Sequence, residues 1–416
     1  METAREKQPD QLNETERDAF HLYFLNHEDA NYQKLVAKLK TLKAEKREIR
    51  ERSAVTLVMQ EKGDSQPMAH ILFRGQYDQQ REKVEPNVPA ALPPLPASFP
   101  RNRLGLAEWL VDASNPLTAR VTVNRFWQEV FGTGIVKTAE DFGSQGQAPS
   151  HPELLDWLAV EFRESGWDVK KFFKLLVSSA TYRQSAVATE EKLKADPENR
   201  LLSRGPRFRM DGEMVRDYAL AASGLLVGRI GGPSVKPYQP EGVWEAVAML
   251  VSNTRYYKPD HGEALYRRSL YTFWKRSAPP ASMDIFNAPT RETCTVRRER
   301  TDTPLQALVT MNDTQFVEAA RHLALRALLA SRQDLDHQFD VIATRLLARR
   351  FGPRERDIAK RAYQDYLAYY DTHTEEARKL LRVGESKVDD DLLTPQFAAL
   401  TMVANQVMNL DEVLNK

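Results

Sequence analysis

Six prolines fall between positions 86 and 100, in the stretch VEPNVPAALPPLPASFPRN, and they constrain the fold more than any other feature. Proline has no backbone N–H and its ring fixes φ, so a helix cannot continue through this stretch. An extended, polyproline-like segment is the expected structure, and we predict a boundary here. Residues 1–53 would be a charged helix from the tail of an upstream domain. Residues 54–100 would be a short β element with a proline-rich linker, and residues 101–416 a mainly helical domain.

The residues before this boundary predict one long charged helix. Between positions 11 and 52 the sequence is polar and helix-favouring, and Leu35, Leu39, Leu42 and Ile49 recur near the helical period. The resulting apolar stripe is narrow. It predicts packing either on a partner helix or on another part of the same protein, and it contains too few heptads to predict a coiled coil.

Short β-like runs predict a small β element within a mainly α protein. Val55–Met59 and His70–Phe73 flank a Gly63-Asp64 turn signal and predict a hairpin. Leu265–Ser277 is rich in aromatic and β-branched residues and predicts a strand that pairs with Thr293–Arg298. Beyond residue 103, apolar residues elsewhere recur at helix-face spacing and predict a multi-helix body.

The charge balance and the cysteine count argue against several classes of function. Basic residues number 59 and acidic residues 58, a net charge of +1, which argues against nonspecific nucleic-acid binding. Cys294 is the one cysteine, so the chain can form no intrachain disulfide, cysteine metal cage or haem-attachment motif. No apolar run approaches the roughly 20 residues of a membrane span, and the N-terminus lacks a secretory signal. We predict no metal site, no cofactor in this chain, no nucleic-acid partner and no membrane span.

The segment DIFNAPTRETCTVRRERTDTPLQALVTMND, residues 284–313, concentrates opposite charges between two apolar stretches. Guanidinium groups are planar forks that bind carboxylate, sulfate or phosphate in bidentate fashion, and nearby aromatic rings offer faces for a sugar. The candidate ligand-binding residues are Arg267, Arg268, Trp274, Asn287, Arg291, Arg297 and Arg298. The alternative is a structural network in which the arginines pair with Glu292, Glu299 and Asp302. The similar numbers of opposite charges favour that alternative.

Three carboxylates and one histidine are candidates for acid–base chemistry: Asp141, His151, Asp284 and Glu292. A carboxylate near an imidazole can transfer protons, and two carboxylates that flank a glycosidic bond can cleave it. The alternative is again structural. His151 lies at a predicted helix start, beside a Ser150–Glu153 capping-box signature, and Asp141 would cap a turn.

Two long stretches closely resemble the planctomycete-specific C-terminal domain. They are NPLTARVTVNRFWQEVFGTGIVKTAEDFGSQGQAPSHPELLDWLA and RRSLYTFWKRSAPPASMDIFNAPTRETCTVRRERTDTPLQALVTMNDTQFVEAAR, and the ending ANQVMNLDEVLNK resembles that domain too. The resemblance runs from about residue 100 to residue 416. It implies a bacterial protein whose full-length relatives are exported, to the periplasm or beyond the cell. Those relatives carry a cytochrome-c-like haem domain upstream, and some carry a lectin-like insertion. The resemblance implies no catalytic residues.

The arginine-rich segment and the lectin-like insertion of relatives favour one function. We predict an exported, polysaccharide-associated protein that binds or processes anionic or sulfated glycans. The alternatives are a noncatalytic scaffold that organises surface proteins and a docking module for the haem domain.

Overall fold

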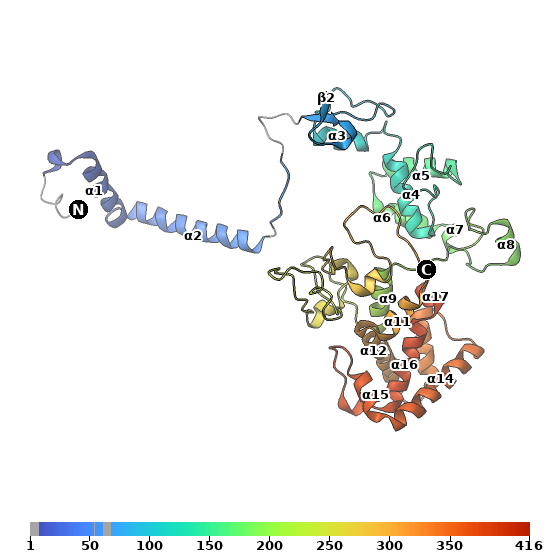
Figure 1. Cartoon of the computed structure of the whole chain (residues 1–416). Coiled ribbons are helices and arrows are strands. Elements are labelled where there is room, and N and C mark those ends of the chain that lie inside the picture. Colours follow the sequence, from blue (N-terminus) through green and yellow to red (C-terminus); the bar gives the residue numbers. More distant parts are fainter. Residues whose placement is uncertain (1–7, 54, 61–67) are drawn as a thin grey trace. The chain divides into compact units, whose positions relative to one another are not determined.

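The computed structural model describes residues 8–53, 55–60 and 68–416 of a chain that divides into two units, Met1–Pro86 and Asn87–Lys416 (Figure 1). Helices account for 53% of the structure and strands for 4%, which confirms the predicted mainly α class. Within the described ranges, no helix is both long enough and apolar enough to cross a membrane. The proline-rich stretch contains no helix, as predicted. The three-part division at residues 53 and 100 stays a prediction.

The N-terminal unit contains two helices whose starts are fixed by side-chain caps. Its elements are η2 (Pro9–Gln11), α1 (Glu14–His27), α2 (Ala30–Arg52), β1 (Ala69–Leu72), η3 (Phe73–Gly75) and β2 (Gln80–Val84). Asn13 accepts a hydrogen bond from the backbone N–H of Glu16 at 2.9 Å, and Asp29 accepts one from that of Asn31 at 2.8 Å. The single long helix predicted over residues 11–52 is instead two helices, because Asp29 caps a new start after α1, and the apolar stripe of α2, including Leu35, is exposed.

The small sheet of this unit differs from the predicted hairpin. β1 and β2 pair antiparallel with Ala69 opposite Val84. The second predicted run does form β1, but its partner is β2 and not Val55–Met59, which has no strand. The predicted Gly63-Asp64 turn lies outside the described residues. A tighter connection, through Gly75 with φ +78°, joins β1 to β2, and a shorter loop costs less entropy to close.

The first part of the second unit is a group of helices around an aromatic core. The helices are α3 (Arg103–Val111), α4 (Thr118–Phe131), α5 (Pro152–Glu164), α6 (Val169–Ser178), α7 (Ala180–Arg183) and α8 (Glu190–Ala195). Val123, Trp127 and Val130 recur on one face of α4 and are buried, so the aromatic stripe of this helix belongs to the core. Asn124, fully buried, donates to the carbonyl of Val136 at 3.0 Å and accepts from its N–H at 2.8 Å, which ties the following loop to α4.

The start of α5 corrects one prediction. His151 occupies the N-cap position, and no side chain caps the helix. The backbone N–H of Ser150 donates to the carbonyl of Ile135 at 2.9 Å, and its hydroxyl lies 3.0 Å from His151 Nδ1. Since these contacts draw Ser150 towards the loop after α4, the predicted capping box with Glu153 is wrong.

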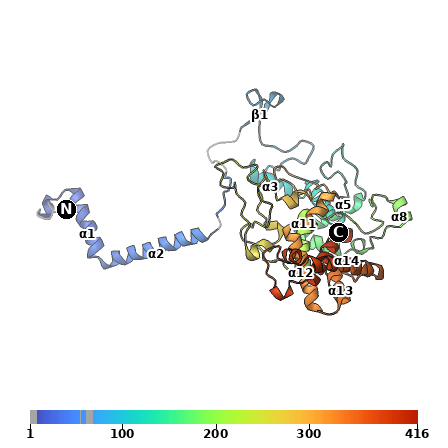
Figure 2. The ribbon, with the colours of Figure 1, turned by 60° about the horizontal axis from the view of Figure 1, so that its bottom comes forward.

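The C-terminal part of this unit is a second bundle, centred on α12 and α16 (Figures 1 and 2). Its helices are α9 (Gly212–Ser223), α11 (Pro304–Asn312), α12 (Thr314–Ala330), α13 (Leu335–Leu347), α14 (Pro353–Thr372), α15 (Thr374–Leu381), α16 (Pro395–Met408) and α17 (Asp411–Leu414). Fully buried alanines, Ala320 and Ala324 on α12 and Ala398 and Ala404 on α16, let these helix backbones approach closely. The short 3-10 turn η6 (Asp390–Leu392) precedes α16.

The segment from residue 225 to residue 303 is mostly irregular, which corrects the second β prediction. It contains η4 (Gly262–Tyr266), η5 (Ser269–Tyr271) and the one-turn helix α10 (Ala281–Asp284). The predicted strand at Leu265–Ser277 is instead a series of turns that meet other segments at isolated bridges, such as Val227 with Arg267. Thr293–Arg298 forms no strand. β-favouring composition alone did not decide the structure, because packing context overrides propensity.

Two buried arginines replace a sheet ladder in holding this segment. Arg216 on α9 donates to the carbonyls of Arg267 at 2.8 Å and Leu265 at 2.7 Å. Arg267 in turn donates to the carbonyls of Arg229 at 3.1 Å and Gly231 at 2.5 Å. Burial lowers the pKa of Arg216 to about 10, so the side chain stays charged at neutral pH. The fold of the irregular segment therefore depends on side-chain donors to main-chain carbonyls.

Candidate functional site

A groove of about 960 Å³ runs along α9, and three of the predicted ligand-binding residues, Arg268, Arg291 and Arg298, line it. We call it the α9 groove. Its lining residues are Glu129, Met210, Asp211, Glu213, Met214, Asp217, Tyr218, Ala221, Leu226, Gly228, Ile230, Arg268, Leu270, Arg291, Arg298 and Lys416. Glu213, Asp217 and Ala221 are spaced four apart, so one face of α9 forms the wall.

Arg298 is anchored by carboxylates at the start of α9. Its Nη1 donates to Glu213 Oε2 at 2.6 Å and lies 3.7 Å from Asp211 Oδ2. Burial opposes the charge, but these contacts outweigh it and raise the pKa of Arg298. Arg300 Nε lies 3.8 Å from Asp211 Oδ1. Among the described residues, these two arginines therefore pair with Asp211 and Glu213, and not with the predicted partners Glu292, Glu299 and Asp302.

Arg268 follows the buried Arg267 in sequence and pairs with Asp217, which lies one turn along α9 from Glu213. Its Nε is 3.5 Å from Asp217 Oδ2, and about half of its side chain is exposed. Asp217 Oδ1 also accepts the backbone N–H of Ser269 at 2.7 Å. Asp217 thus fixes both the turn and the guanidinium that lines the groove.

Arg291 is held by an aromatic ring. Its guanidinium carbon lies 4.2 Å from the centre of the Trp274 ring, and the indole N–H of Trp274 donates to the carbonyl of Thr290 at 3.0 Å. The backbone of Arg291 has φ +63°, a left-handed conformation that costs a non-glycine residue about 1 kcal/mol. In the part of the chain that the structure describes, no carboxylate lies within ion-pair distance of Arg291.

The other candidate ligand residues have different surroundings. Arg267 is buried and its Nη groups contact carbonyls. Arg297 is exposed, and its Nη2 lies 3.5 Å from Glu140 Oε1. Asn287 donates to the Thr301 hydroxyl at 2.6 Å. None of these three lines the α9 groove.

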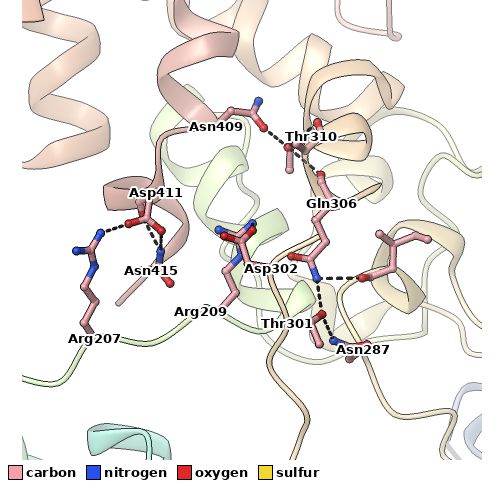
Figure 3. A network of polar contacts seen from close by, with 12 residues as sticks. Arg207, Arg209, Asn287, Thr301, Asp302, Gln306, Thr310, Asn409, Asp411 and Asn415 are labelled. Atoms are coloured by element: carbon pink, nitrogen blue, oxygen red, sulfur yellow. Dashed lines mark hydrogen bonds and ion pairs between the residues drawn. The ribbon is translucent and has the colours of Figure 1, made fainter. Parts of the chain in front are cut away.

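A polar network holds the end of the arginine-rich segment against the helices, as Figure 3 shows. Gln306 Nε2 donates to the Thr301 hydroxyl at 3.1 Å, and Thr310 donates to the side chain of Asn409. Arg209 pairs with Asp302 at 3.2 Å, and Arg207 pairs with Asp411. The segment that carries Arg298 is therefore fixed at its C-terminal end to both α11 and the chain terminus.

The candidate acid–base residues are not gathered in the groove. Asp141 Oδ1 accepts the backbone N–H of Gly143 at 2.7 Å, a turn-capping contact. Asp284 is exposed on α10, and Glu292 Oε2 lies 3.7 Å from Arg276 Nε. His151 lines a separate cavity near α5. Their catalytic roles stay predictions.

Five charged groove residues were not among the predicted site residues: Glu129, Asp211, Glu213, Asp217 and Lys416. The spacing of Glu213 and Asp217 on one helix face was a signal that could have identified these two residues. Lys416 had no local signal, because the chain end reaches the groove by pairing with Phe208. The backbone N–H of Lys416 donates to the Phe208 carbonyl at 2.9 Å. Burial lowers the pKa of the Lys416 amine.

The groove carries four cationic and four anionic side chains beside apolar ones such as Ile230 and Leu270. Such a surface can bind a polar polymer through guanidinium groups and apolar faces together. Among the described residues, no group of three or more His, Cys, Asp or Glu side chains is placed to hold a metal ion.

Comparison with known proteins gives one match. The family PSD1, described as a protein of unknown function (DUF1553), matches residues 102–363, which is more than half of the chain. No curated protein and no solved structure matches.

Proposed function

The chain belongs to the PSD1 family of unknown function (DUF1553), and we propose that it binds an anionic or sulfated glycan in the α9 groove. The observation that carries this proposal is the position and conformation of Arg291. It lines the groove, stacks on Trp274 and adopts a strained backbone conformation. Strain of this kind is concentrated at ligand sites, where the surrounding structure maintains it.

The other two arginines of the groove support the same proposal. Asp217 positions Arg268, while Asp211 and Glu213 position Arg298. A guanidinium with some of its five N–H donors engaged can still offer the others to a sulfate or a uronate carboxylate. Pre-positioned side chains lose less conformational entropy on binding.

The test is binding of a defined sulfated oligosaccharide, for which we choose a chondroitin sulfate hexasaccharide, to Arg291→Gln. The expected result is at least a tenfold loss of affinity by calorimetry, since a charge-assisted contact contributes about 1.5–3 kcal/mol. Arg276→Gln is the matched control. Arg276 is exposed, lies near Glu292 and does not line the groove.

Two outcomes would reject the proposal: equal loss in both arginine variants, or equal binding by the parent protein of a hexasaccharide that has been desulfated and carboxyl-reduced and so has no charge. Reducing-end release measured on the same samples decides whether the glycan is also cleaved. Asp284→Asn then tests the predicted acid–base role of that residue.

The proposed setting is a planctomycete protein, periplasmic or extracellular, in which haem is carried by an upstream domain. The resemblance of residues 100–416 to the planctomycete-specific C-terminal domain supports this setting. Mass spectrometry of the native protein from fractionated cells would test it, and detection only in the cytoplasm would overturn it.

Docking of a cytochrome-c-like haem domain is a second candidate function, favoured by one exposed loop. Met249, Leu250 and Val251 are each at least 80% exposed and consecutive in sequence. Consecutive apolar side chains in solvent are typical of a protein contact surface. Mixing the chain with an isolated haem domain should give binding that Leu250→Asp weakens. Binding that Leu250→Asp leaves unchanged would exclude this loop.

A further inference from the structure

A second hollow, separate from the α9 groove, lies between the end of α4 and the start of α5. Its volume is about 270 Å³, and it shares no lining residue with the groove. We call it the α4–α5 cavity. The charged and polar side chains that line it are Thr133, Ser150, His151, Glu198, Asn199, Arg200, Arg207 and Arg300. Trp127, Phe131 and Phe208 contribute aromatic walls.

The lining of this cavity is positive, in contrast to the balanced groove. Three arginines and one carboxylate, Glu198, line it, and one of the arginines, Arg207, also pairs with Asp411, which does not line the cavity. The carboxylate of Glu198 is already engaged, because Lys137 donates to its Oε2 at 2.6 Å. A small concave site with an excess of one charge concentrates counter-ions.

Two of the arginines are held in place by the loop after α4. Arg200 donates to the carbonyls of Gly134 at 3.1 Å and Ile135 at 3.3 Å. Arg300 donates to the carbonyl of Gly132 at 3.0 Å, and its guanidinium carbon lies 4.2 Å from the centre of the Phe208 ring. The positive charges are therefore fixed in position before any ligand arrives.

The charge of Arg300 is only partly compensated. Its Nε lies 3.8 Å from Asp211 Oδ1, which is beyond hydrogen-bond distance, and Asp211 lines the α9 groove and not this cavity.

The N-terminal end of α5 also contributes positive electrostatic potential to the α4–α5 cavity. His151, its N-cap residue, lines the cavity, and no side chain caps this 13-residue helix. The N-terminal end of a helix carries partial positive charge from its unpaired N–H groups, and anions bind there readily.

We propose that the α4–α5 cavity binds a tetrahedral oxyanion, a phosphate or sulfate group, either free or carried by a small molecule. The arginines supply the charge, and the N-terminal end of α5 adds positive potential. This site is independent of the glycan site proposed above.

Calorimetry on the full chain at constant ionic strength tests the proposal with inorganic phosphate, inorganic sulfate and a monosaccharide sulfate as separate probes. Saturable binding at one site per chain is expected for at least one probe. A preference for the inorganic ions identifies a free-ion site, and a preference for the ester identifies a small-molecule site.

Three variants test the location. Arg300→Gln should weaken binding at least tenfold. Arg207→Gln should weaken it severalfold, and since Arg207 is more than half exposed this variant should fold normally. Thr133→Glu places a carboxylate among the arginines and should abolish binding without lowering the melting temperature. Arg276→Gln is the control and should bind like the parent protein, because Arg276 is exposed and lines neither this cavity nor the α9 groove.

The proposal is overturned if the parent protein binds none of the three probes. It is also overturned if Arg207→Gln and Thr133→Glu, both shown to be folded by circular dichroism, bind with parental affinity. Equal weakening by Arg276→Gln would also overturn it, because it would indicate general surface attraction and not a built site.

Discussion

Arginine has opposite roles in two neighbouring regions of this chain. In the core of the irregular segment, residues 225–303, Arg216 and Arg267 are almost completely buried and donate to main-chain carbonyls. Along residues 291–300, Arg291 and Arg297 are exposed and contact a ring or a surface carboxylate. The same side chain is therefore part of the scaffold in one region and available to a ligand in the other. Burial, and not residue type, makes the difference.

The largest expected effect comes from removing a scaffold arginine. Arg216→Met leaves Gln315 Oε1 and the carbonyls of Leu265 and Arg267 without their donor. Loss of a buried charged donor costs about 3–5 kcal/mol, so the free energy of unfolding in urea should fall by that amount. Arg268→Met is the matched control and should change it by less than about 1 kcal/mol. Equal effects would mean that burial does not separate the two regions.

A third buried arginine extends the comparison to the C-terminal bundle. Arg321 and Glu318 are fully buried, and Glu318 Oε1 accepts hydrogen bonds from the Tyr266 hydroxyl at 2.8 Å and the Ser386 N–H at 2.7 Å. Gly384 covers this cluster with φ +87°, and a Cβ there would lie 2.2 Å from the Glu318 carboxyl carbon.

Gly384→Ala should therefore lower the free energy of unfolding by about 2 kcal/mol, because strain and a clash are added together. Gly228→Ala, at an open position, is the control and should have little effect. The measurement is again urea unfolding. If Gly384→Ala were as stable as the parent protein, the side chain of Glu318 could move away from the added methyl group without a loss of stability.

Surface ion pairs should contribute less to the free energy of unfolding than the buried arginines do, and their contribution should depend on pH. Hydrogen bonds from Arg349 lower the pKa of Glu355 to about 2, from an unperturbed 4.5. The folded-state pKa is the lower one, so the stabilisation is complete above about pH 4.5 and is lost as the pH falls towards 2. Since about two fifths of each side chain is exposed, solvent screening keeps the effect below about 1 kcal/mol.

Glu355→Gln should thus be slightly less stable than the parent protein at pH 6, and the difference should shrink as the pH approaches 2. Urea unfolding at both ends of this range measures it. A difference that grows on acidification would have the wrong sign and would remove Glu355 as the cause.

The smallest effect is expected for the exposed ion pair between Arg276 and Glu292 of the arginine-rich segment. Arg276 and Glu292 are both about 60% exposed and lie 3.7 Å apart. Arg276→Gln should change the free energy of unfolding by no more than about 0.5 kcal/mol. A loss above about 1 kcal/mol would place this pair with the scaffold arginines.

Local sequence predicted the helices well and the arginine contacts poorly. Apolar spacing identified α4 and α5, because a helix that packs on one face must repeat its apolar residues every three or four positions. The strand predicted around Trp274 failed, because Arg216 provides from a distant helix the donors that a neighbouring strand would have provided.

The candidate site shows the same limit. Paired charges were expected within residues 284–302, but the partners of Arg298 lie outside this stretch, at Asp211 and Glu213. Lys416 reaches the groove by backbone pairing with Phe208. Such contacts join positions far apart in sequence, and one chain read by itself contains no signal for them.

The single thiol of the chain lies in a useful place. Cys294 is exposed, between Arg291 at the groove and Arg297 on the surface. A maleimide fluorophore attached there would label one known position without any engineered mutation. Its emission would change when a saccharide orders or displaces this stretch, so occupancy of the groove could be followed optically in real time.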